Sequence, residues 1–386
     1  MGDEALLSWV RLLADEVGPR RPTGEAERRA AELVRERLAE RGLEAELQTF
    51  EGYSTFAVPL LAILGLAVAP SLLPRRRRVL RSALAAGSVA ALLTEGGLVR
   101  TPLSDALSRR PSQNLVATIE PSGPVERTVC LVCHLDTSRS GLMFDPRFVA
   151  HLTPWLKAQS AACLVGAAEP VLGSPRAGLP GRAILAGART VLAAGLAVVI
   201  ERELRGQDTP GANDNASGVA VVAELALRLA ADPLEGTRVV ALMTGCEEAG
   251  LLGTHAFLRS RDTSGWIFVN VDNVGGPATL RYLLQEGFAL TWDSDPALVK
   301  IARDVASRRP ELGLEPGDGP IGLTYDATPV LARGGRAITL VAGDDGVIPN
   351  YHWPTDTTEN LDPDSIERAL EATSEIVAAI DRGQAG

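Results

Sequence analysis

Residues 217–272 of the 386-residue chain read SGVAVVAELALRLAADPLEGTRVVALMTGCEEAGLLGTHAFLRSRDTSGWIFVNVD and decide the fold class. Residues 217–231 and 249–261 carry apolar side chains at helical spacing. Residues 237–244 and 265–271 are short apolar runs, typical of buried strands. Strands that alternate with helices of about 12–15 residues predict an α/β protein. We expect a mixed, largely parallel central sheet that is covered by helices on both faces.

The same alternation continues on both sides of this stretch. We expect three further helices, one from Thr23 as N-cap to Gly42 and two at residues 296–308 and 363–381. We also expect strands at residues 43–50, 115–119, 128–133 and 337–341. The sequence shows no internal repeat and no long low-complexity tract.

Charge divides the chain into an acidic body and two basic inserts. The chain has 38 Lys+Arg and 48 Asp+Glu, a formal net charge of −10. Residues 52–113 carry a net +6 and residues 137–200 a net +4, which leaves −20 on residues 1–51, 114–136 and 201–386 together. We expect these three ranges to form one domain. The acidic total argues against a nucleic-acid partner, and four Cys exclude a fold built on disulfides.

Both inserts are also the most apolar part of the chain. Residues 56–73 are 18 residues without a charge, about the length of a bilayer span, and residues 183–200 contain one charge. Arginines stand in the turns, at Arg75–Arg78 and at Arg176 and Arg182. This pattern predicts two apolar helical hairpins that insert into a membrane with cationic turns. The alternative is a soluble cytoplasmic protein whose inserts form a cap or a homo-oligomer interface.

Side chains that bind metals follow three of the expected strands. The first of these strands leads into His134 and Asp136, the second into Glu247 and Glu248, and the third into Asp272. Ligands of open α/β sheets bind outside the carboxyl ends of the strands. We therefore expect these side chains to meet at one edge of the sheet.

Two turns add further candidates, Asp214 just before a helix and His352 near the C-terminus. Two His and several carboxylates are a typical ligand set for one or two zinc ions. Two Zn²⁺ ions would be neutralised by Asp214, Asp272, Glu248 and a bridging hydroxide. Such a pair lowers the pKa of a bound water and clamps a reacting carbonyl. Glu247 is adjacent to a ligand but is not itself needed to bind metal, so it is the candidate general base.

Each residue alone has an ordinary structural interpretation. An Asp after a strand is usually a turn or cap residue, and a His at a strand end is more often a hydrogen-bonding residue than a ligand. The metal-site hypothesis depends on all of these residues lying together at one sheet edge.

Cys130 and Cys133 before His134 spell a haem-attachment pattern. Residues i and i+3 of a strand face opposite sides of the sheet, which argues against a shared haem or a zinc clip.

The blocks that carry these residues resemble, in order, peptidase family M28, the zinc-dependent aminopeptidases and carboxypeptidases. The blocks are His134-Leu-Asp136, residues 211–218, residues 247–253 with Phe257, Asp272, Tyr325-Asp-Ala-Thr-Pro329 before Gly334-Gly335, and His352 with Asp356. They span nearly the whole chain outside the inserts. The resemblance implies a zinc-exopeptidase-like fold with a catalytic domain formed by the three acidic ranges.

The resemblance also implies the metal ligands. Asp214 would bridge two zinc ions, while His134 and Asp272 would complete one metal and Glu248 and His352 the other. The chain departs from the family at Tyr325-Asp326-Ala327, where Ser-Asp-His is usual. That His is not a ligand, so this departure affects substrate contacts and leaves the ligand set intact.

Further roles follow from the same resemblance. Glu247 would be the base that later protonates the leaving amine, and Asp136 would orient His134. Asp356 would support His352, and a cis peptide would follow Asp214. Either Tyr325 or Tyr351 could donate a hydrogen bond to the tetrahedral oxyanion, or could be a packed aromatic residue.

The sequence therefore predicts a two-zinc metallo-exopeptidase for peptide substrates, most simply an aminopeptidase in which Glu247 activates a metal-bridging water. Alternatives on the same scaffold are a carboxypeptidase and a glutaminyl-cyclase-like enzyme. A different class is a non-catalytic membrane receptor or scaffold, which we disfavour because Glu247 and all five ligand positions are retained.

Overall fold

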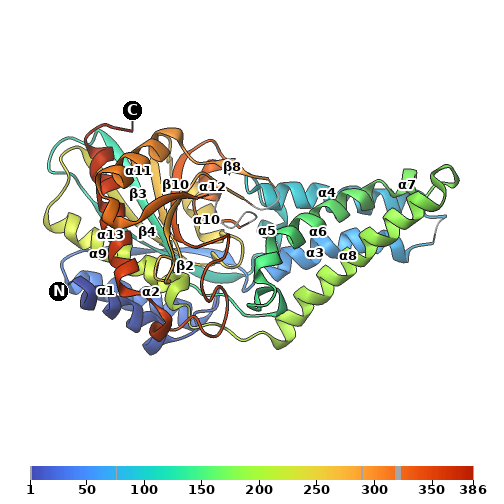
Figure 1. The fold of residues 1–386 in the computed structure, drawn as a ribbon, viewed down its shortest axis with the longest axis horizontal. Coiled ribbons are helices and arrows are strands. Elements are labelled where there is room, and N and C mark those ends of the chain that lie inside the picture. Colours follow the sequence, from blue (N-terminus) through green and yellow to red (C-terminus); the bar gives the residue numbers. More distant parts are fainter. Residues whose placement is uncertain (1, 75, 288–289, 318–322, 386) are drawn as a thin grey trace.

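The computed structural model describes residues 2–74, 76–287, 290–317 and 323–385 (Figure 1). Within these ranges, eight strands form one mixed sheet in the order β1-β2-β4-β3-β5-β10-β6-β9. The strands are β1 (Ala45–Gly52), β2 (Arg110–Ile119), β3 (Arg127–His134), β4 (Thr237–Thr244), β5 (Ile267–Val271), β6 (Leu280–Leu283), β9 (Leu314–Gly317) and β10 (Arg336–Ala342). The central strands β4, β3, β5 and β10 are parallel to one another. The predicted fold class is confirmed.

Helices cover both faces of the sheet because its central strands are apolar on both sides. One face packs on α1 (Gly2–Arg11), α2 (Glu25–Glu40), α9 (Gly218–Ala231), α11 (Pro296–Arg308) and α13 (Pro363–Asp381). The other face packs on α10 (Leu252–Ser260) and α12 (Thr328–Leu331). Cys130 belongs to the second of these cores and Cys133 to the first, so their thiols lie on opposite faces of β3.

Five helices form an arm that projects from this body (Figure 1). They are α3 (Ala57–Leu72), α4 (Arg78–Gly97), α6 (Leu152–Ala167), the short α7 (Glu169–Leu172) and α8 (Gly178–Arg205). Helix α3 packs on α4 and α8, and α6 packs on α4 and α8, so the two hairpins form one bundle with its own apolar core. The short α5 (Pro102–Leu107) connects α4 back to β2.

Arg202 anchors the arm to the body at the base of α8. Its guanidinium donates to the hydroxyls of Thr55 (3.0 Å) and Ser138 (3.2 Å) and lies 4.1 Å from the ring centre of Phe56. Within the described ranges, α8 is the one helix long and apolar enough to cross a membrane by length and composition, and α3 is apolar but shorter.

The predicted bounds match the structure for β4, α11 and α13. Thr23 is not the N-cap of α2, because its φ of 60° places it in a turn and Gly24 takes the cap position. The strands β6 and β9 and the small pair β7 (Gln285–Glu286) and β8 (Trp292–Asp293) were not predicted. They are two to four residues long, too short to show a period of two.

Candidate metal centre

Three neighbouring parallel strands deliver the predicted ligands to one edge of the sheet. His134 is the last residue of β3, Glu248 stands in the turn after β4, and Asp272 follows β5 directly. Because β4, β3 and β5 are adjacent and parallel, their carboxyl ends lie side by side. Asp214 and His352 arrive at the same edge from loops, and all five side chains are buried.

The first cluster contains His134, Asp214 and Asp272, each with one potential ligand atom facing the others. His134 Nε2 lies 3.2 Å from Asp214 Oδ1 and 3.6 Å from Asp272 Oδ2. Burial lowers the pKa of His134, but Asp272 and Glu247 raise it by more, so that its pKa lies well above the ordinary value.

The second cluster contains His352, Asp214 and Glu248. His352 Nε2 lies 3.1 Å from Asp214 Oδ2 and 3.1 Å from Glu248 Oε1. Asp214 therefore offers one carboxylate oxygen to each cluster, the arrangement that a bridging ligand requires. Burial lowers the pKa of His352, and Glu248 and Asp214 overcome this effect and raise the pKa to about 9.

The donor set fits divalent zinc. Three carboxylates and two imidazoles are the ligand types that zinc binds, and buried carboxylates are stable only when positive charge neutralises them. Asp214 Oδ2 and Glu248 Oε1 are buried and, apart from His352 Nε2 at 3.1 Å from each, have no hydrogen-bonding partner among the described residues. His134, Asp214 and Asp272 could hold one metal ion, and Asp214, Glu248 and His352 a second.

The backbone around Asp214 is held by Asp356. The two carboxylate oxygens of Asp356 accept hydrogen bonds from the backbone N–H groups of Asn213 (2.6 Å) and Asp214 (3.1 Å). The Asp214–Asn215 peptide bond is cis, as the resemblance implied. Asp356 was expected to support His352, but it holds the Asp214 turn, and His352 Nδ1 has no hydrogen-bond partner among the described residues.

Asp136 links the first cluster to the turn that carries the two glutamates. Its carboxylate accepts from the backbone N–H groups of Glu247 (3.1 Å) and Glu248 (3.0 Å). The ring Nδ1 of His134 lies 3.1 Å from the main-chain oxygen of Asp136 and 3.7 Å from its carboxylate. Asp136 thus contacts His134 through its carbonyl and positions Glu247 through its side chain.

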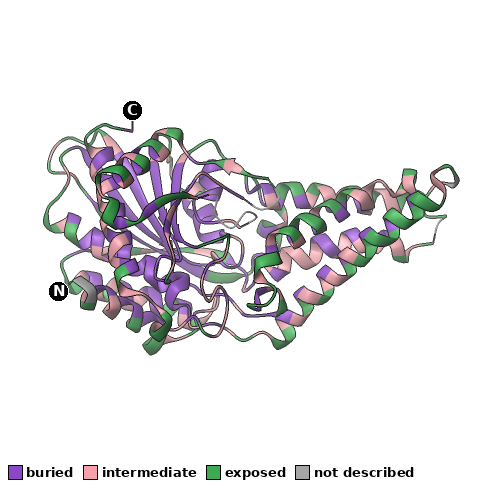
Figure 2. Ribbon diagram, in the orientation of Figure 1, coloured by how far each residue is buried: buried purple, intermediate pink, exposed green. Residues whose placement is uncertain are grey.

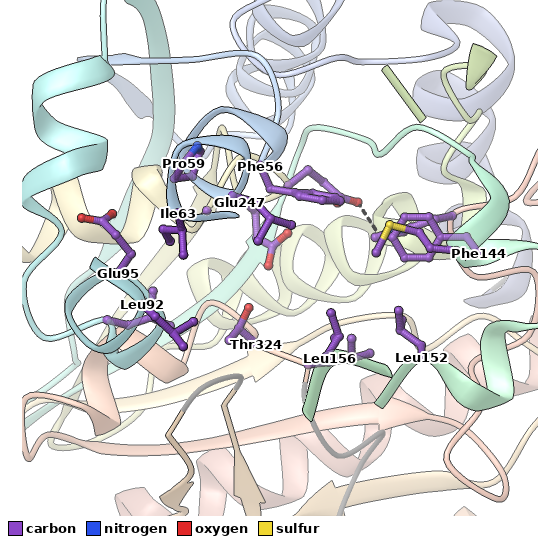
Figure 3. A pocket seen from close by; sticks show the side chains of 18 of the residues that line it. Phe56, Pro59, Ile63, Leu92, Glu95, Phe144, Leu152, Leu156, Glu247 and Thr324 are labelled. Atoms are coloured by element: carbon purple, nitrogen blue, oxygen red, sulfur yellow. Dashed lines mark ion pairs between the residues drawn. The ribbon is translucent and has the colours of Figure 1, made fainter. Parts of the chain in front are cut away.

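Glu247 lines an apolar cavity of about 220 Å³ between the body and the base of the arm (Figure 3). Burial raises the pKa of Glu247 well above its ordinary value, with Glu248 adding to the rise and His134 opposing it. Residues of both inserts form the cavity wall, among them Phe56 and Ile63 from the first insert and Phe144 from the second. The carboxylate therefore stands between the buried ligands and a space that a substrate side chain can enter.

The two tyrosines occupy different positions. Tyr351 stacks on His352 with ring centres 3.8 Å apart and lines the cavity. The hydroxyl of Tyr325 is buried without a hydrogen-bond partner among the described residues. Burial raises the pKa of Tyr325 well above its ordinary value, and Asp272 raises it further. Tyr325 therefore presents an unused donor beside the carboxylates.

Sequence reasoning did not find Arg20 and Glu27, which hold the loops of the site. The fully buried guanidinium of Arg20 joins three segments by donating to the carbonyls of Leu13 (2.8 Å), Leu135 (2.7 Å), Pro210 (2.8 Å) and Gly211 (2.8 Å). Glu27 accepts from the N–H of Cys246 (2.8 Å), at the turn that carries Glu247. A charged residue in the turn-rich stretch Gly18-Pro-Arg-Arg-Pro22 is a weak signal, because the carbonyls that Arg20 binds come from distant parts of the chain.

The sheet, its helices and the carboxylate–imidazole site define the fold of the zinc exopeptidases. Residues 197–377 match the model of peptidase family M28, which confirms the resemblance predicted from the sequence. A probable lipoprotein aminopeptidase of Mycobacterium tuberculosis is 29% identical over 181 residues, 40% of this chain and 36% of the relative. The matched region thus spans little more than a third of that relative.

Solved structures share the fold over almost the whole chain. A zinc aminopeptidase from Bacillus subtilis has a TM-score of 0.59 at 15% identity and covers 98% of this chain and 95% of its own. The glutaminyl cyclase of Porphyromonas gingivalis has a TM-score of 0.57 at 16% identity and covers 97% of each chain. These solved structures show the shared fold, and the family match adds the peptidase M28 model over residues 197–377.

Proposed function

We propose that the chain is a two-zinc exopeptidase, and specifically an aminopeptidase. The observation that carries this proposal is the division of the Asp214 carboxylate between two clusters, with His134 Nε2 at 3.2 Å from one oxygen and His352 Nε2 at 3.1 Å from the other. A single-metal enzyme has no need of a second complete set of buried ligands. The aminopeptidase assignment is supported by the names of the relatives in sequence and fold.

Bound zinc supplies Lewis-acid chemistry, which lowers the pKa of a water molecule and polarises the scissile carbonyl. The carboxylate of Glu247 accepts the proton of the attacking water and passes it to the nitrogen of the leaving amine. Asp136 holds the Glu247 backbone in place for both transfers. The Tyr325 hydroxyl donates a hydrogen bond to the oxyanion, a role that suits a buried donor without another partner.

The structure of the inserts supports the proposed division of the chain. Residues 1–51, 114–136 and 201–386 form the zinc peptidase domain, and residues 52–113 and 137–200 form insertions whose helices build the arm. We propose that the arm associates with a membrane, in line with the length and apolar composition of α8 and with the lipoprotein relative.

A glutaminyl-cyclase-like reaction is the second candidate, because three such enzymes are similar in fold. Zinc content separates the two functions when it is measured together with activity. Purified chain should contain about two zinc ions and release N-terminal residues from peptides in a chelator-sensitive reaction. Glu247→Gln should keep the zinc and lose activity by about 10²–10⁴-fold, since it removes proton transfer alone.

Glu46→Gln is a matched control, because Glu46 is an exposed residue of β1 outside the site. It should leave zinc content and activity unchanged. Zinc near zero per chain would contradict the hydrolase. One zinc per chain, with cyclisation of N-terminal glutamine in place of peptide cleavage, would support the cyclase.

A further inference from the structure

The far end of the arm contains a cavity of about 740 Å³ between the α3–α4 turn and the α6–α8 turn. Two arginines from each hairpin line it, Arg78 and Arg81 from α4 and Arg182 and Arg189 from α8. Glu169 is the one acidic residue among the described lining residues. The lining therefore carries three positive charges in excess.

Glu169 neutralises only part of this cluster. Its carboxylate pairs with Arg81 and, at 2.6 Å, with Arg189. Arg78 and Arg182 form no ion pair with any residue that the structure describes. Two guanidinium groups from different hairpins are thus available to one anion. Guanidinium is the side-chain group best suited to phosphate, because its planar fork binds two oxygens at once.

The rest of the cavity is amphiphilic. Leu73, Ala85 and Leu185 contribute apolar surface, while Ser82 and Ser174 contribute polar side chains. Neither serine hydroxyl is hydrogen-bonded to a described residue. The cavity thus combines free donors for a polar headgroup with apolar surface for the hydrocarbon next to it.

Large apolar side chains close in sequence to the lining residues are exposed to solvent. Leu72 is 79% exposed, Val79 87%, Val171 70% and Leu179 79%. They stand in the same two turns as the arginines. Water solvates such side chains poorly, and apolar residues beside unpaired arginines are typical of surfaces that enter the interface of an anionic membrane.

The sides of the arm carry the same signature. Leu80, Leu93, Leu164 and Ile184 from three different helices are between 43% and 53% exposed, and Figure 2 shows exposed and partly exposed segments along the arm beside a largely buried sheet. A helix that is apolar on its outer face as well as its inner face suits a hydrocarbon environment.

We propose that this cavity binds the phosphate headgroup of an anionic phospholipid, with Arg78 and Arg182 as its ligands from the two hairpins. The inference rests on the proposed membrane association and extends it from general attachment to a defined lipid site. A lipid held between the hairpins also ties their ends together. An acidic protein would satisfy the arginines, but it would leave the exposed apolar residues of the same two turns unexplained.

The test titrates the full chain, purified with zinc in a non-ionic detergent, with short-chain phosphatidylglycerol and measures binding by native mass spectrometry. We expect Arg78→Gln/Arg182→Gln to weaken binding about 30-fold, since each arginine near a membrane surface contributes about a tenfold factor or less. The matched control is Arg76→Gln/Arg77→Gln, which removes the same charge from exposed arginines of the same turn that do not line the cavity. This control should bind within about threefold of the unmodified chain.

Three further ligands separate the sources of the anion. Short-chain phosphatidylcholine and inorganic phosphate should bind at least about tenfold more weakly than phosphatidylglycerol. Equal losses in both double variants would overturn the site and leave only diffuse charge attraction. Binding of inorganic phosphate as tight as that of the lipid would assign a free-anion site, and equally tight binding of polyglutamate would assign an acidic protein partner.

Three measurements on the same samples keep this proposal separate from those before it. Peptide hydrolysis and zinc content report on the proposed enzyme, and sedimentation with membranes reports on attachment. If the chain bound phosphatidylglycerol and phosphatidylcholine equally well but kept its peptidase activity and its membrane attachment, the lipid site alone would be overturned. A chain that stays soluble without detergent would overturn the membrane association on which the site rests.

Discussion

The body and the arm place their apolar residues by opposite rules. In the body, α2 buries Ala30, Val34 and Leu38 and turns charged residues outward. In the arm, α8 buries one residue in every three or four, as Leu185, Ala188 and Leu192 illustrate. Its outer face, however, remains mostly Ala, Ile and other uncharged residues. The body therefore turns charged residues to its surface, whereas the arm exposes many uncharged and apolar ones.

The two regions also differ in where their charges lie. The body buries a set of carboxylates around the candidate metal site, and the arm carries arginines at its far end. Buried acids are costly unless cations or hydrogen bonds compensate them. Stability of the body should thus depend on buried polar contacts and on pH, and stability of the arm should depend on apolar packing and on its surroundings.

Arg20→Met gives the largest expected effect on the body. The substitution leaves the carbonyls of Leu135 and Pro210 without a donor, whereas those of Leu13 and Gly211 still accept from the backbone N–H groups of Gly18 and Ala216. Each unsatisfied buried group costs about 1–3 kcal/mol, so we expect a loss of about 4 kcal/mol in the free energy of unfolding. Denaturant unfolding of the purified chain measures it. Arg29→Met, at an exposed position of α2, is the control and should change stability by less than about 0.5 kcal/mol. Equal effects would mean that Arg20 has no special role in joining the loops.

Glu286→Gln tests the dependence of the body on pH. Glu286 is buried between the hydroxyls of Thr328 (3.0 Å) and Thr339 (3.2 Å), and burial raises its pKa to about 8. The folded chain therefore holds a proton that the unfolded chain releases from about pH 4.5 upward, and stability falls as pH rises from about 4.5 to 8. Gln is neutral at every pH, so the variant should gain roughly 2–3 kcal/mol over the unmodified chain at pH 9 and almost nothing at pH 4. Melting curves at both pH values check this, and a gain that does not change with pH would contradict the buried proton.

Much of the body could be predicted from the sequence because its signals are local. The bounds of β4, α11 and α13 were predicted correctly, because apolar spacing and flanking turns agree for all three and a Pro marks the start of both helices. The meeting of His134, Glu248 and Asp272 could be predicted because parallel strands bring their ends to one edge. The partner of Asp356 could not be predicted, since its carboxylate binds backbone N–H groups 142 and 143 residues away.

The arm shows a different limit of sequence reasoning. Apolar segments and arginine-rich turns predict hairpins, but the spacing of apolar residues does not tell an inner face from an outer one when both are apolar. The structure resolves this by packing α3 against α4 and α8, which leaves residues such as Ile184 outside. The cavity at the far end could not be predicted either, because its arginines come from two hairpins that are separated by about a hundred residues.

Ile184 and Leu185 provide the smallest and sharpest comparison within the arm. They are neighbours on α8, but Ile184 is 50% exposed and Leu185 is 5% exposed. In detergent, Leu185→Gln should lower the free energy of unfolding by about 2–3 kcal/mol, because it removes a buried apolar side chain. Ile184→Gln should change it by less than about 0.5 kcal/mol in detergent and should reduce detergent binding, as measured by the size of the protein–detergent complex. If Ile184→Gln were as destabilising as Leu185→Gln, the outer face of α8 would be packed against protein, and a second copy of the chain would replace the membrane as its partner.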